Sequence, residues 1–167
     1  MPEAQSPSSL PKPRRIVTGH NEEGVATVKH DSYLDIQPYG DGTNLTPFWY
    51  TNEQPADVSS PQDKAFLEPA MPLLGSGFTA YDLPPKSEGL FHRTITLDHV
   101  IVVQGSLILG LEDGSRIKLN EGDVVVQQAT MHNWSNVTTE WARIYGIMFP
   151  ARAPSVIGKT LETVWPL

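Results

Sequence analysis

Apolar and β-branched residues alternate with polar ones along short stretches of the second half of the chain. This period of two is typical of β-strands and differs from the period of a helix. The stretches HVIVVQG, SLILGLE, RIKL, DVVVQQ and WARIYGIMF follow it between residues 99 and 149, and the turn sequences EDGS and NEGD interrupt the series. Because no stretch has a convincing amphipathic helical pattern, the sequence predicts an all-β sandwich or jelly-roll barrel.

The first half has a less regular pattern. The segment RRIVTGHNEEGVATVKH predicts a hairpin of two short strands, and residues 38–76 are rich in Pro and Gly, which is typical of ordered loops. Within those loops we expect a strand around FWY at 48–50 and a short helix near Asp63–Leu67. The next stretch, GSGFTAYDLPP, alternates until its Pro pair, which favours an edge strand.

These patterns divide the chain into four parts. We expect a disordered leader over 1–13, N-terminal strands and wrapping loops over 14–80, a core barrel over 81–150 and a tail over 151–167. Residues 14–167 are expected to form one structural domain, since 167 residues suit a single core.

Composition and charge narrow the classes of function. The formal net charge is -7 and no basic run is long enough to neutralise a series of phosphates, so nucleic acid is a poor partner. No stretch is apolar and long enough to span a membrane or to form the core of a signal peptide, and we expect a cytoplasmic protein. The chain has no cysteine, so any metal would be held by His, Asp or Glu.

An unusually polar strand face lies in the segment LFHRTITLDHV. Alternation places His92, Thr94, Thr96 and Asp98 on one face, with Phe91, Ile95 and Leu97 among the residues of the other. If the polar face is inside a barrel, each of its groups needs a partner, and a metal ion would satisfy several at once. If it faces solvent, the three apolar side chains fill the core instead.

The segment GLFHRTITLDHVIVVQG resembles the first motif of the cupin superfamily, in which Gly, His-x-His, Glu and Gly follow one another at set spacings. His92 matches the first His, Thr94 stands where the second His is expected, Asp98 replaces Glu and Gly105 closes the motif.

The segment GDVVVQQATMHNWSN resembles the second cupin motif, with His132 in the ligand position. Its Pro and Gly are missing and its spacing is one residue short. With the opening RRIVTGHNEEG, the chain resembles a divergent branch of small single-domain cupins, some of whose fungal members accompany natural-product enzymes. The resemblance implies a cupin jelly-roll barrel, a double-stranded β-helix, with an N-terminal strand extension.

The resemblance also implies a site inside the barrel. His92, Asp98 and His132 are the expected catalytic residues and the expected ligands of a divalent metal, Zn, Fe(II) or Mn. Without metal, Asp98 and a histidine could form an acid–base pair. A second set of polar and aromatic residues is expected to contact the substrate: Thr94, Gln104, Trp134, Arg143 and Tyr145.

Three functions fit these residues. The first is a metal-dependent lyase of secondary metabolism that dehydrates or decarboxylates a small polyketide-like molecule or carboxylic acid. The second is an Fe(II)-dependent oxygenase or other oxidoreductase with the same ligands. The third is a barrel that binds a small molecule without catalysis. The resemblance further implies a homodimer.

Overall fold

The computed structural model describes residues 7–39, 42–68 and 74–165, and residues 1–6 of the expected leader and 166–167 of the tail lie outside these ranges. The described part contains one short 3-10 helix, η1 (Lys64–Phe66), within the stretch that predicts a helix. No helix in these ranges is long and apolar enough to cross a membrane. The strands are β1 (Arg14–His20), β2 (Ala26–Tyr33), β3 (Gln37–Pro38), β4 (Asn44–Tyr50), β5 (Gly77–Leu83), β6 (Ser87–Glu88), β7 (Thr96–Gln104), β8 (Ser106–Leu111), β9 (Arg116–Asn120), β10 (Val124–Gln128), β11 (His132–Asn136), β12 (Ala142–Pro150), β13 (Ser155–Val156) and β14 (Lys159–Thr160).

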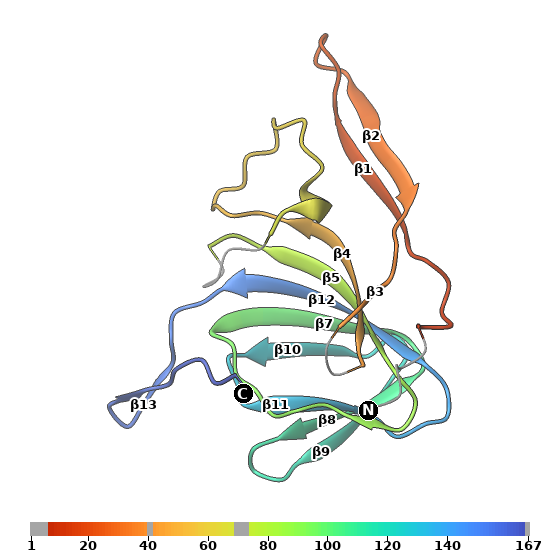
Figure 1. Cartoon of the computed structure of the whole chain (residues 1–167). Coiled ribbons are helices and arrows are strands. Elements are labelled where there is room, and N and C mark those ends of the chain that lie inside the picture. Colours follow the sequence, from red (N-terminus) through yellow and green to blue (C-terminus); the bar gives the residue numbers. More distant parts are fainter. Residues whose placement is uncertain (1–6, 40–41, 69–73, 166–167) are drawn as a thin grey trace.

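Two antiparallel sheets form the body of the protein (Figure 1). One has the strand order β10-β7-β12-β5-β4-β3, and the other has the order β6-β11-β8-β9. Their inner faces enclose a core that includes Val102, Leu107 and Ile144, all at most 4% exposed. The all-β jelly-roll prediction is therefore confirmed, and the five strand patterns of the second half correspond to β7, β8, β9, β10 and β12.

Gly105 makes the tight connection between β7 and β8 in the described fold. Its φ is +80°, a conformation that residues with a side chain rarely adopt, and an added Cβ would lie 3.0 Å from the Cβ of Ala142. This glycine lets β8 leave the six-stranded sheet directly after β7 ends.

Strand β5 is internal, so the expectation of an edge strand was wrong. It pairs with β12 on one side and with β4 on the other. The Pro pair that suggested an edge, Pro84 and Pro85, follows the last residue of the strand and removes no ladder hydrogen bond from it. The core barrel was expected to begin at residue 81, but β4 and most of β5 precede or span that position. Residues before position 81 therefore form part of the six-stranded sheet.

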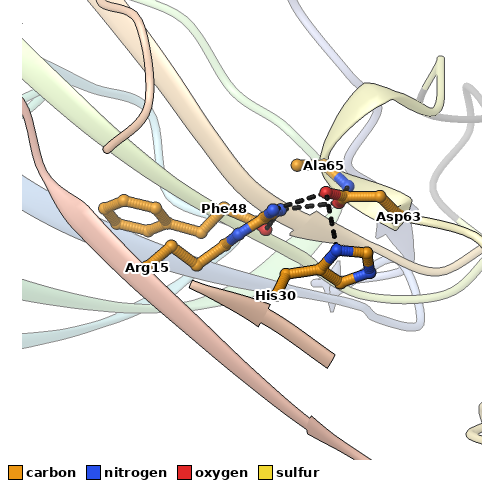
Figure 2. Close-up of polar contacts among 5 residues, drawn as sticks. All are labelled: Arg15, His30, Phe48, Asp63 and Ala65. Carbon is orange, nitrogen blue, oxygen red and sulfur yellow. Dashed lines mark hydrogen bonds and ion pairs between the residues drawn. The ribbon is translucent and has the colours of Figure 1, made fainter. Parts of the chain in front are cut away.

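The β1–β2 hairpin projects away from the two sheets (Figure 1). Its base is fixed by Arg15, which is 7% exposed and donates to both carboxylate oxygens of Asp63, at 2.6 and 2.5 Å, and to the carbonyl of Phe48 at 3.2 Å (Figure 2). His30 of β2 reaches the same carboxylate, with its Nδ1 3.8 Å from Asp63. Arg15 and the carboxylate of Asp63 thus connect the hairpin to the segment that begins η1.

Residues 11–13 of the expected leader contact the body. Pro13 accepts a hydrogen bond from the amide of Leu34, and Pro11 accepts one from Arg143 at 2.9 Å. Arg143 also donates to both carboxylate oxygens of Asp82, at 2.5 and 2.6 Å, and this ion pair is almost fully buried.

Candidate active site between the two sheets

Two histidines meet where the chain crosses from one sheet to the other. His92 and His132 form an antiparallel bridge, in which each amide donates to the other residue's carbonyl at 3.0 Å. Residues directly opposite in such a bridge point their side chains to the same side, and the two imidazole rings lie 4.3 Å apart, centre to centre. The structure therefore brings these two predicted residues together.

Asp98 approaches the interior from the other sheet. It lies on β7, paired with Gln127 of β10 and Met148 of β12, and is 7% exposed. Its Oδ1 is buried and has no hydrogen-bond partner. Burial raises the pKa of Asp98, while a hydrogen bond from Thr96 and the charge of His92 act in the opposite direction. The carboxyl group is thus within electrostatic reach of His92 and has one oxygen free for a donor.

His132 is held in an orientation that favours the neutral ring. Its Nδ1 lies 2.9 Å from the carbonyl of Thr130, and the amide nitrogen of Gln127 lies 2.6 Å from both ring nitrogens. Because the Thr130 carbonyl can only accept, we assign the proton to Nδ1, which leaves Nε2 to accept from Gln127. Burial, the largest cause, and the charge of His92 together lower the pKa of His132 to about 4, against the backbone contact with Thr130. At neutral pH the ring is an uncharged imidazole with an acceptor nitrogen.

The predicted metal site does not form as a three-ligand group. Among residues 7–39, 42–68 and 74–165, no three His, Asp or Glu side chains lie close enough together to hold a metal ion. The Nδ1 of His92 lies 3.0 Å from the carbonyl of Leu90, and the ring nitrogens of His132 already have partners. As placed, the side chains of His92, Asp98 and His132 do not fit a shared metal, and the divalent metal stays a prediction.

Two of the five expected substrate residues border this site. The hydroxyl of Thr94 lies 2.8 Å from that of Thr96, which in turn contacts Asp98, so the two threonines link the loop before β7 to the carboxylate. Trp134 of β11 packs against the core, and its ring lies 6.0 Å from that of His132.

The other three expected substrate residues lie elsewhere. Gln104 is exposed at the end of β7, and Arg143 is 4% exposed and occupied by Asp82. Tyr145 packs edge-on against Phe48 and Phe78, with ring centres 5.1 and 5.9 Å away. The structure therefore gives these three side chains other surroundings, and for Arg143 a structural partner.

Tyr145 also borders a cleft of about 790 Å³ that contains none of the other predicted site residues. The cleft lies between the β1–β2 hairpin, the segment 56–62 and the aromatic side chains of Phe48 and Phe78. Its size suits a small molecule. We place the candidate chemistry at Asp98 and the histidines because the unpartnered buried carboxylate oxygen lies there.

Two residues at the site were missed by the sequence analysis. Gln127 is 4% exposed and contacts His132, and stepping two positions along β10 from the half-buried Val125 would have found it. Trp165 lies edge-on to His92, with ring centres 5.1 Å apart. No pattern in the sequence indicates that contact, because it joins segments far apart in the chain.

Comparison with known proteins gives the same fold and a group of relatives. The chain is 30% identical over 165 residues to the phomopsin biosynthesis cluster protein C' of Diaporthe leptostromiformis, covering 93% of this chain and 87% of that protein. It is 32% identical over 130 residues to the cupin-domain-containing oxidoreductase virC of Hypocrea virens, covering 74% and 67%. The solved cupin domain of Schizosaccharomyces pombe Cnp3 superposes with a TM-score of 0.54 at 11% identity, covering 83% of this chain and 88% of that one. No protein-family model matches the chain.

Proposed function

The chain belongs to the cupin superfamily, and within that family we propose that it is an oxidoreductase acting on a small organic molecule in the biosynthesis of a natural product. The observation that carries the proposal is the similarity, at 32% identity, to a protein named as a cupin-domain-containing oxidoreductase. The relative from a phomopsin biosynthesis cluster supports the metabolic setting. These relatives favour the oxidoreductase over the lyase that the sequence analysis placed first.

We assign the reaction to Asp98 and His132, two buried residues on different sheets. An oxidation that forms a double bond removes two electrons and two protons from the substrate, so it needs groups that accept protons. The unpartnered Oδ1 of Asp98 can accept a hydrogen bond from a substrate hydroxyl and then its proton. The electrons and the remaining proton pass to an external acceptor, for which dioxygen is our expectation.

The surroundings of Asp98 suit proton transfer. Burial disfavours the carboxylate, which makes it a stronger base than an exposed Asp. His132 is an uncharged ring whose Nδ1 contacts the carbonyl of Thr130 and whose Nε2 has a donor of its own. Gln127 donates toward that nitrogen and limits the rotation of the ring. Asp98 is therefore the proposed catalytic base, and Gln127 is a positioning residue.

The test compares turnover with and without dioxygen. Purified protein is incubated with a panel of hydroxylated aromatic polyketides, and products are followed by mass spectrometry. The proposal expects products that have lost two hydrogens, and it expects their formation to stop without dioxygen and in Asp98→Asn. Products that have lost water or carbon dioxide, formed equally well under anaerobic conditions, would refute it.

A further inference from the structure

A row of four aromatic rings crosses the site, beginning at the half-exposed Trp165. His92 and His132 are opposite one another, and Trp134 follows two positions along β11. On the other side of His92, Trp165 extends the row, so that successive ring centres lie 5.1, 4.3 and 6.0 Å apart. Such spacings are those of interacting aromatic pairs.

The position of Trp165 is fixed by the backbone. Arg93 and Val164 form an antiparallel bridge with two hydrogen bonds of 2.8 and 2.9 Å, which places the next residue, Trp165, opposite His92 and on the same side. The segment reaches this bridge after the β13–β14 hairpin, in which Ile157 is fully exposed. The segment 161–165 thus adds one more strand-like element beside His92.

Exposure is highest at the Trp165 end of the row and lowest at His132, while His92 and Trp134 are half-buried. Trp165 is 54% exposed, whereas His132 is 4% exposed. A half-exposed indole at the outer end of a buried aromatic row is a large apolar surface that a ligand can cover, and edge and face contacts with its ring favour another flat π system.

We propose that Trp165 is a substrate-binding residue and that the substrate is a planar, uncharged aromatic molecule with a hydroxyl group; this inference rests on the proposed function, because it concerns the same site. The rings of the row recognise the flat skeleton. The hydroxyl donates to the Oδ1 of Asp98, which has no other partner. A carboxylate in place of the hydroxyl has no proton to donate at neutral pH and would leave the buried Oδ1 without a partner.

Three probes test the shape and the charge of the ligand by calorimetry on the full chain. The probes are 2-naphthol, its saturated analogue decahydro-2-naphthol and the anion 2-naphthoate. The wild-type protein is expected to bind 2-naphthol most tightly. Loss of one aromatic pair in Trp165→Ala is expected to weaken 2-naphthol binding about three- to tenfold and to weaken binding of the saturated analogue less.

Two further variants separate recognition from folding. Trp165→Phe keeps a ring and is expected to restore most of the 2-naphthol affinity, while Ile157→Ala, on the preceding exposed hairpin, is expected to bind like the wild type. Equal binding of 2-naphthol by the wild type and Trp165→Ala would overturn the proposal, as would absence of 2-naphthol binding or a preference of the wild type for the saturated probe or the anion. Turnover dependent on dioxygen, measured separately with the wild type, would leave the proposed function standing in any of these cases.

Discussion

Replacing Asp98 with Asn should stabilise the metal-free protein at neutral pH. A pKa raised above the ordinary Asp value of 3.8 means that the folded state holds the proton more tightly than the unfolded chain does. Stability is therefore highest below pH 3.8 and falls as the pH rises to the pKa of the folded state, above which the full cost of the buried charge remains. The amide side chain in Asp98→Asn has nearly the same shape as the carboxyl group and carries no charge at any of these pH values.

The size of the effect follows from the unpartnered oxygen. A buried group with an unpartnered polar atom costs about 1–3 kcal/mol and more when it is charged, so removing the charge beside the unpartnered Oδ1 of Asp98 should recover an amount of this order. For a chain of this length, a change of about 1–3 kcal/mol in the free energy of unfolding corresponds to a shift of roughly 2–12 °C in Tm. The increase for Asp98→Asn should be largest near pH 7 and should narrow as the pH falls toward 3.8.

Thermal unfolding followed by circular dichroism between pH 7 and pH 4, with chelator present, measures this difference. Asp113→Asn is the matched control, because Asp113 is exposed and its pKa is lowered by the amide of Ser115. That substitution should lower Tm slightly at pH 7, the opposite sign. A Tm of Asp98→Asn equal to or below that of the wild type at pH 7, or a difference that does not change with pH, would show that Asp98 is not a buried, uncompensated charge.

Three further outcomes are expected. Because the folded state resists protonation of His132, the wild type should lose about 3 kcal/mol of stability as the pH falls from 6.5 to 4, and His132→Asn should not show this loss. Parallel pH profiles of the wild type and the variant in chelator-treated urea unfolding would contradict this. Arg143→Met should cost about 3–5 kcal/mol by leaving Asp82 charged and buried, and the double change with Asp82→Leu should recover part of it; a neutral Arg143→Met in urea unfolding would be evidence against that pair. If the predicted metal set is correct, elemental analysis of protein prepared without chelators should find one divalent metal per chain that is lost in His92→Ala; a metal-free wild type would refute it.

The alternation of apolar and polar side chains predicted most of the strands in the second half of the chain, but it did not predict β11. In β7 the buried positions alternate from Thr96 to Val102, as a strand with one covered face requires. In β11, by contrast, His132, Asn133, Ser135 and Asn136 are all at most 4% exposed. A strand of polar residues covered on both faces has no period of two in its hydrophobicity, so its sequence HNWSN is typical of a loop.

The same reasoning explains the partial success at the site. Thr96 and Asp98 share a buried face of β7, as predicted. Extending the alternation backwards assigns His92 to that face, but β7 begins only at Thr96, and His92 pairs with His132 of the other sheet. The regular strand does not extend back from Thr96 to His92, and the alternation of side chains cannot show this interruption. As a result, His92 and Asp98 lie on opposite walls of the interior.

This division between two walls suits the proposed chemistry. Asp98 belongs to the six-stranded sheet and His132 to the four-stranded sheet, and burial shifts the pKa of each toward its uncharged form. Transfer of a proton between a substrate and Asp98 or His132 therefore changes the charge of a desolvated site. Such a change is costly unless a neighbouring group compensates for it through its own charge or hydrogen bonds. Gln127 extends from the strand paired with Asp98 and contacts His132, so it links the two walls. The relative positions of Asp98, Gln127 and His132 depend on the distance between the two sheets. Core substitutions that change this distance should therefore reduce turnover before they unfold the protein.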